Sequence, residues 1–212
     1  MGSEPPPDAS PEPTVFVVDD DADVRQALDA LLRAVGLRVE SYDSADAFLA
    51  ADRTQAPGCL LLDMRLVGRS GLALQSLLLE QGCELAIVFM SGHVDVPMAV
   101  KAMKNGAIDV LTKPLRPADL IDAVNLALAT DEARREERRS FELLRLAHAS
   151  LSEREREVMG RIVSGLPNRE TAEALGISEA TVKAHRARIM QKMGARTLAH
   201  LVDAARRLGA GP

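Results

Sequence analysis

The sequence is poor in aromatic residues, with one Tyr, four Phe and no Trp among 212 residues. Any core must therefore be mainly aliphatic. Cysteine is also scarce: Cys59 and Cys83 lack metal-ligand spacing, and two cysteines do not make a disulfide framework. No apolar run approaches the ~20 residues of a membrane-spanning helix. Residues 1–13 are Pro-rich and acidic and lack the apolar centre of a signal peptide. These absences predict a soluble, cytoplasmic protein with a disordered leader over residues 1–13.

The length and the charge distribution indicate two parts. A chain of 212 residues suits two small domains. Residues 1–130 contain ten Lys and Arg against nineteen Asp and Glu, whereas residues 131–212 contain sixteen against twelve. The acidic balance of residues 1–130 suggests a metal or phosphate site, and the basic balance of residues 131–212 suggests a polyanion partner. Solvated faces of uneven sign would give the same totals, so charge alone leaves both readings open.

Short apolar runs alternate with amphipathic stretches over residues 14–130. Such runs are typical of strands buried on both faces of a parallel sheet. Five alternations predict a doubly wound α/β domain. The expected strands are Thr14–Val18, Leu37–Ser41, Cys59–Leu62, Leu85–Met90 and Ile108–Leu111. The expected helices are Asp23–Val35, Ser44–Ala51, Gly71–Glu80, Val96–Asn105 and Pro117–Ala129.

Residues 131–150 read as a helical linker. Asp131 with Arg135 and Glu136 with Arg139 have the spacing of ion pairs on a solvated helix. Phe141, Leu144 and Leu151 form a narrow apolar stripe, with His148 on the same side. Either this is a plain connector helix, or the stripe is a short coiled-coil seam that helps two chains to pair.

Residues 151–212 contain only helix signals. Ser152 and Glu155 form a capping box, and Asn168, Ser178 and Thr197 are expected to cap three further helices. Gly176 can end the second helix in a left-handed conformation. Two helices separated by Gly-Ile-Ser are typical of a helix-turn-helix unit, here within an all-α, four-helix domain.

Polar residues stand where the expected strands end. Asp19 and Asp20 follow the first strand, and Asp63 follows the third; Ser91 follows the fourth and Lys113 the fifth. Ligand sites of open α/β sheets form outside the carboxyl ends of the strands, so these groups should meet. Three converging carboxylates need a counter-ion, and their oxygens suit Mg²⁺. Pro114 follows Lys113, and a cis bond there would aim the Lys inward.

This set of residues has the chemistry of phosphoryl transfer. The Asp63 carboxylate can attack a phosphoryl donor and form an aspartyl phosphate. Mg²⁺ and Lys113 would neutralise charge on the transferred group. The Ser91 hydroxyl can donate a hydrogen bond to a phosphate oxygen and so sense the modified state.

Residues 14–130 resemble a CheY-like receiver domain, and SGHVDVPMAVKAMKNGAIDVLTKP resembles receivers of the FixJ branch. The resemblance implies strand order 2-1-3-4-5 and a sensor histidine kinase as phosphodonor. It implies that Asp63 is the phosphoacceptor and that Ser91 and Lys113 hold the phosphate. The implied Mg²⁺ site comprises Asp19, Asp20, Asp63 and the backbone carbonyl of Arg65.

Two positions depart from the family pattern. Val67 stands where the family usually has Pro, four residues after the phosphoacceptor. Val110 stands where it has an aromatic switch residue, three residues before the Lys. The site should still accept phosphate, although the aromatic switch cannot operate. A regulator of the same fold that is controlled without phosphorylation stays open as an alternative.

The segment LSEREREVMGRIVSGLPNRETAEALGISEATVKAHRARIMQKMGA resembles the LuxR/NarL/FixJ-type DNA-binding domain. An inner apolar stripe holds the third helix against its neighbours, and it comprises Leu175, Ile177, Val182, Ile189 and Met193. The rest of the third helix is strongly basic, as binding in a major groove requires. The resemblance places Lys183, Ala184 and Ala187 toward the bases, and Lys183 can hydrogen-bond guanine. Arg188 and Thr181 are expected on phosphates, and Arg186 and Lys192 complete the basic surface. Thr171 replaces the family's usual Ile, at a small cost in packing.

The sequence therefore predicts a phosphorylation-controlled transcriptional regulator that is not an enzyme, with activation as the direction that the resemblance favours. Duplex DNA and the kinase are the expected partners, and RNA polymerase is a further candidate. The resemblance implies an active homodimer formed by the fourth helix, fifth strand and fifth helix. On the fourth helix this surface is expected to contain Val96, Met98, Ala99, Ala102 and Met103.

Two other classes of protein share part of this pattern. A haloacid-dehalogenase-type phosphatase would use Asp19 and Asp21 in a D-x-D pattern, followed by Ser91 and Lys113. That class needs a further acidic pair on a later strand, where none is expected here, and it leaves Asp63 without a role. A receiver whose helical domain binds only protein is disfavoured by the basic third helix.

Overall fold

The structure is a computed structural model that describes residues 12–92 and 96–209. Residues 1–11 of the expected leader and residues 210–212 of the expected output domain lie outside the described residues. The chain divides into two compact units, Met1–Arg135 and Glu136–Pro212.

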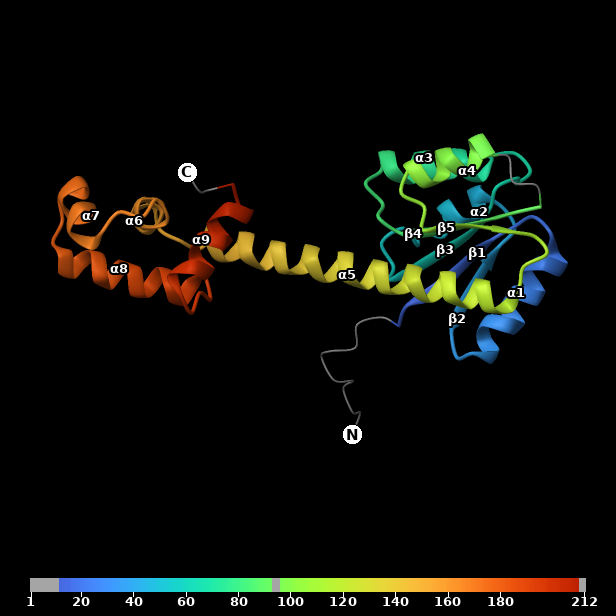
Figure 1. The fold of residues 1–212 in the computed structure, drawn as a ribbon, viewed down its shortest axis with the longest axis horizontal. Helices are drawn as coiled ribbons and strands as arrows, with labels where there is room; N and C mark the ends of the chain where they lie inside the picture. The colour runs from blue at the N-terminus through green and yellow to red at the C-terminus, as the bar shows by residue number, and fades with distance from the viewer. Residues whose placement is uncertain (1–11, 93–95, 210–212) are drawn as a thin grey trace. The chain divides into compact units, whose positions relative to one another are not determined.

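The first unit contains a five-stranded parallel sheet with the order β2-β1-β3-β4-β5 (Figure 1). The doubly wound α/β fold and the strand order are thereby confirmed. The strands are β1 (Thr14–Val18), β2 (Arg38–Tyr42), β3 (Gly58–Asp63), β4 (Ala86–Ser91) and β5 (Asp109–Thr112). Asp63 and Ser91 were expected just after their strands but are the last residues of β3 and β4. Both are thus held by the sheet itself.

Helices cover both faces of this sheet. They are α1 (Ala22–Ala34), α2 (Ala45–Ala50), α3 (Gly71–Glu80), α4 (Val96–Lys104) and α5 (Pro117–Ala149). One core joins α1 and α5 to the face that carries Val15 and Val17, and the other joins α2, α3 and α4 to the face of Phe16 and Val18 (Figure 1). This division follows from the alternation of side chains along a strand. The core beneath α2, α3 and α4 also contains Phe48 and Phe89, so it holds three of the chain's four Phe residues.

Helix α5 runs without interruption from Pro117 to Ala149, although the sequence suggested two helices meeting near residue 130. No Gly or Pro stands in residues 118–149 to break it. Leu144 and Ala147 pack against the core of the second unit, to which Leu151 belongs. The predicted stripe is therefore used within the chain, and the coiled-coil seam is wrong for Leu144 and Leu151.

The second unit is built from the end of α5 and four further helices. These are α6 (Glu153–Val163), α7 (Asn168–Leu175), α8 (Glu179–Lys192) and α9 (Leu198–Arg207). The capping box of Ser152, the caps of Ser178 and Thr197 and the left-handed Gly176 are confirmed. The predicted Asn168 cap is wrong, because Asn168 is already helical and its Oδ1 accepts a hydrogen bond from Arg186 (3.3 Å).

Candidate functional site

The carboxyl ends of the strands bring together side chains that lie far apart in the sequence. Asp19 follows β1 and is 1% exposed, Asp63 ends β3 and is 5% exposed, and Ser91 ends β4 and is 1% exposed. Lys113 follows β5, and its Nζ lies 2.6 Å from Asp19 Oδ2 and 2.9 Å from Asp63 Oδ1. One lysine thus bridges the two buried carboxylates. The Lys113–Pro114 bond is cis, as anticipated.

Backbone amides complete the solvation of both carboxylates. Asp19 Oδ1 accepts a hydrogen bond from the Asp21 N–H, and Asp63 Oδ2 accepts one from the Arg65 N–H, both at 2.9 Å. Burial lowers the pKa of Lys113, but hydrogen bonds and charge from Asp19 and Asp63 raise it by more, so the net shift is upward. The amine therefore stays protonated and offsets part of the negative charge.

The residues expected to bind Mg²⁺ are only partly assembled. Among residues 12–92 and 96–209, no group of three or more His, Cys, Asp or Glu side chains is arranged to hold a metal. Asp19 and Asp63 share the Lys113 amine, whereas Asp20 and Arg65 are exposed at the surface. The donor chemistry fits a partly hydrated Mg²⁺, which needs carboxylate and carbonyl oxygens beside open positions.

The two departures from the family pattern differ in their surroundings. Val67 is 78% exposed, so the usual Pro is replaced at the surface and not in the core. Val110 is half-buried beside Phe89 in the sheet register. It also lines an open hollow of about 700 Å³ along β5 and α5. The side chain at the switch position is therefore small, with open space beside it.

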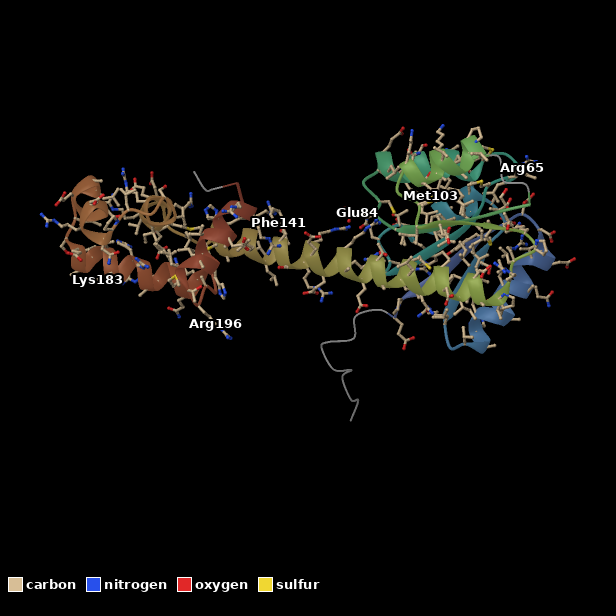
Figure 2. The ribbon with its side chains drawn as sticks, viewed as in Figure 1. Arg65, Glu84, Met103, Phe141, Lys183 and Arg196 are labelled. Atoms are coloured by element: carbon tan, nitrogen blue, oxygen red, sulfur yellow. The ribbon has the colours of Figure 1, made fainter. Side chains whose placement is uncertain are left out.

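Part of the predicted DNA-binding set forms one exposed surface of α8. Val182 and Ile189 are fully buried and hold the helix on its neighbours. The exposed residues are Thr181, Lys183, Ala184, Ala187 and Arg188. Lys183 (labelled in Figure 2) has a loose ion pair with Glu179 at 3.7 Å, and this lysine is free to reach outward.

The other two residues of the predicted basic surface have partners inside the domain. Arg186 donates to Asn168. Lys192 Nζ lies 2.6 Å from Glu155 Oε2 and donates to the Ser150 carbonyl oxygen at 3.0 Å. Sequence reasoning missed this ion pair, since 37 residues separate its members and no local spacing signals it. Because these partners engage both side chains within the domain, a DNA contact is less favoured for Arg186 and Lys192 than for the exposed residues of α8.

Thr171 has a cost beyond packing. It is fully buried, and its hydroxyl has no hydrogen-bond partner among the residues that the structure describes. Within the described residues, His185 Nδ1 is also buried without a hydrogen-bond partner. An unsatisfied buried hydroxyl is destabilising, so Thr171 weakens the helical unit slightly compared with the family's Ile.

A doubly wound sheet with Asp19, Asp63, Ser91 and Lys113 at its carboxyl edge, followed by a helix-turn-helix unit, defines a class of protein: a receiver with a DNA-binding output domain. Residues 15–125 match the family model of the response regulator receiver domain. Residues 149–205 match that of the luxR family of bacterial regulatory proteins. The chain belongs to the FixJ/NarL family of response regulators with a LuxR-type output domain.

Similar proteins match along nearly the whole chain. The response regulator protein TmoT of Ectopseudomonas mendocina is 45% identical over 197 residues, which cover 93% of this chain and 90% of that protein. The transcriptional regulatory protein FixJ of Azorhizobium caulinodans is 44% identical and covers 93% of this chain and 94% of its own. A low-resolution structure of the response regulator StyR has a TM-score of 0.85 at 45% identity, covering 93% of this chain and all of that one.

The family membership answers the broader questions that the sequence raised. The protein is a transcriptional regulator and not an enzyme; its receiver implies a histidine kinase partner, and its output domain implies DNA binding. Asp21 caps α1 through bonds to the Asp23 and Val24 amides, and the described elements after β5 are all helices. The phosphatase reading thus lacks both its second Asp and its later strand. No helix in the described ranges is long and apolar enough to cross a membrane.

Proposed function

We propose that this chain is a DNA-binding transcriptional activator, controlled by a phosphoryl group that Asp63 accepts from a phosphohistidine of a sensor kinase. The observation that carries the proposal is the Lys113 amine, which lies between the buried carboxylates of Asp19 and Asp63. A buried, cation-paired aspartate at the carboxyl end of a central strand is suited to nucleophilic attack on phosphorus.

The side chains have separate roles in this transfer. An Asp63 carboxylate oxygen bonds to phosphorus as the phosphorus–nitrogen bond of the phosphohistidine breaks. Lys113 neutralises charge on the transferred group, and the Ser91 hydroxyl, at the end of the neighbouring strand, donates to a phosphate oxygen. Asp19, Asp20 and the Arg65 carbonyl, together with Asp63, would hold Mg²⁺, which supplies further charge neutralisation.

The output domain would bind duplex DNA through α8. We assign base contacts to Lys183, Ala184 and Ala187 and phosphate contacts to Thr181 and Arg188, all of them exposed. Arg186 and Lys192 instead act by holding α8 on α7 and α6, in keeping with their partners Asn168 and Glu155. A homodimer formed through α4, β5 and α5 would present two such helices to two half-sites, with RNA polymerase recruited at the promoter.

Phosphorylation of Asp63→Asn tests the proposal. Wild-type protein incubated with Mg²⁺ and acetyl phosphate should gain one acid-stable, base-labile phosphate by intact mass, and Asp63→Asn should gain none. Asp109→Asn is the matched control, because Asp109 is exposed at the start of β5, away from the carboxyl ends of the strands. Undiminished labelling of Asp63→Asn would contradict the assignment.

A second candidate function is the same regulator controlled without phosphorylation. Val67 and Val110 favour it, since both replace residues that the family usually keeps near the site. The same labelling experiment separates the two: a wild-type protein that takes up no phosphate from either acetyl phosphate or a cognate kinase supports the second candidate.

A further inference from the structure

Helix α5 is tied to the receiver by a group of hydrogen bonds that the phosphoacceptor site does not use. Asp131 is only 4% exposed; its Oδ2 accepts from the Gly58 N–H (3.0 Å) and lies 2.6 Å from Arg135 Nε. The two terminal nitrogens of Arg135 donate to the backbone oxygens of Gln55 and Ala56. We call Asp131, Arg135 and their partner segment 55–58 the latch.

The latch differs from a surface ion pair at helical spacing. Such pairs contribute only a few tenths of a kcal/mol, and the neighbouring Glu136–Arg139 pair is of that kind, at 3.6 Å and more than 60% exposed. Asp131 is a buried carboxylate, which is costly unless it is fully paired. Its negative charge also acts on strand β3, because burial first and the charge of Asp131 second raise the pKa of the Cys59 thiol to about 12.

Segment 55–58 is itself rigidly held. Gly58 has φ +148°, and an added Cβ would lie 1.9 Å from the Thr14 carbonyl oxygen, so only glycine fits. The N–H of the same Thr14 donates a hydrogen bond to the Pro57 oxygen at 3.0 Å. Segment 55–58 thus contacts strand β1 through Thr14 and helix α5 through Asp131 and Arg135. The α5 side of the latch is therefore bound to a rigid part of the receiver.

The latch and the phosphoacceptor lie at opposite ends of one strand. Gly58 is the first residue of β3 and Asp63 the last, about 16 Å apart at the usual rise per residue. In Figure 2, Arg65, two residues after Asp63, and Glu84 are labelled at opposite ends of the sheet. Glu84 is on the latch side, where its carbonyl oxygen accepts a hydrogen bond from Arg134 of α5 (3.2 Å).

We propose that the latch holds the start of the linker part of α5 to the receiver and keeps it helical, and that the effect of phosphate on Asp63 reaches the output domain through it. Residues 136, 137 and 139, which follow the latch, are exposed. A helical stretch whose residues are largely exposed is only marginally stable by itself, so the anchors at its ends help to keep it ordered. The second half of the proposal rests on the proposed function.

Amide hydrogen exchange in the full chain tests the first half. Arg135→Ala should speed exchange over residues 131–140 about tenfold or more, because charge-assisted hydrogen bonds are lost. Arg139→Ala, which removes the exposed pair on the same helix, should leave exchange unchanged, and Arg135→Lys, which keeps the charge, should lie between. Amides of β4 report whether the receiver stays folded. Unchanged exchange in Arg135→Ala would overturn the proposal, as would an equal loss of protection in β4.

DNA binding with and without beryllofluoride tests the second half. In Arg135→Ala the increase in operator affinity on treatment should be lost, while labelling of Asp63 stays normal. An increase equal to that of wild type would overturn this half. If wild-type protein itself shows no labelling, the proposed function fails, but the exchange result on the latch stands independently.

Discussion

Lys113 decides the electrostatics of the site, because it is the cation that neutralises two buried carboxylates at once. Each of these carboxylates gives one oxygen to the amine and the other to a backbone amide. Without Lys113, two like charges would face each other in a buried place with no cation between them. The same residue thus stabilises the resting site and, in the proposed mechanism, binds the transferred phosphate.

Lys113→Ala should still accept phosphate from acetyl phosphate, since Asp63 and the ligands proposed for Mg²⁺ remain. The signal should be lost, because no amine is left to bind the phosphate, and operator affinity should not rise on labelling. Intact mass and a gel-shift assay measure the two properties. Arg53→Ala removes an exposed cation that pairs with Glu40 and not with Asp19 or Asp63, and it should keep both properties. A normal affinity increase in Lys113→Ala would contradict this role.

At the scale of elements, α8 has two functions on different faces. Its buried residues Val182 and Ile189 fix it in the helical core, while the exposed ones are proposed to meet DNA. Lys192 extends the structural role, because it connects the end of α8 to the capping box that opens α6.

Lys183→Ala should weaken binding to a specific operator by about 1–3 kcal/mol and relax the preference at one base position. Arg188→Ala should weaken binding to specific and random duplexes alike and flatten the salt dependence, as expected for a phosphate contact. Fluorescence anisotropy with both kinds of duplex at several salt concentrations distinguishes the two. If Lys183→Ala lost affinity equally on both duplexes, Lys183 would not read bases.

Glu155→Gln should destabilise the output domain and reduce its sensitivity to acid. The hydrogen bond from Lys192, and next the Ser152 N–H, lower the pKa of Glu155 from 4.5 to about 2. A lowered pKa stabilises the fold above pH 4.5, and this contribution is lost as the pH falls from 4.5 toward 2. Hydrogen exchange of α8 amides across this range measures it. Glu153→Gln, an exposed change in the same helical turn, is the control; equal acid sensitivity of Glu155→Gln and wild type would contradict the prediction.

At the scale of the whole molecule, the apolar surface of α4 bears on assembly. Val96, Val100 and Met103 are 70%, 46% and 47% exposed and share one side of the helix. Ala102 was expected on this surface but is fully buried in the core, so that expectation is wrong, and Val100 takes its place. The surface remains apolar and pliable, which suits contact with a second copy.

Because Val110 replaces an aromatic ring, we expect the two states of the receiver to differ little in packing. A small free-energy gap leaves the dimer-competent state populated without phosphate. Sedimentation velocity should therefore detect some dimer in untreated protein and only a modest increase with beryllofluoride. Val110→Tyr, which restores the ring, should make the protein more strictly monomeric before treatment. A wild-type monomer that becomes wholly dimeric on treatment would show that Val110 has not weakened the switch.

Much of the fold and of the candidate site was accessible from the sequence. Apolar runs, glycines and caps such as Ser152 and Ser178 act over at most a few residues, so their spacing predicts strands, helix starts and turns. The convergence of Asp19, Asp63, Ser91 and Lys113 was also predictable, since the carboxyl ends of parallel strands meet at one edge. Asn168 shows the limit of local signals: a good capping residue was used in another bond.

The tertiary structure alone decided which distant groups pair. The Lys113 bridge joins residues 94 apart, the bond from Gly58 to Asp131 joins residues 73 apart, and the Lys192–Glu155 pair joins residues 37 apart. A sequence shows which residue types are available but not which buried charge finds which partner. That choice is made when packing removes water and leaves each polar group only the partners that the fold brings within reach.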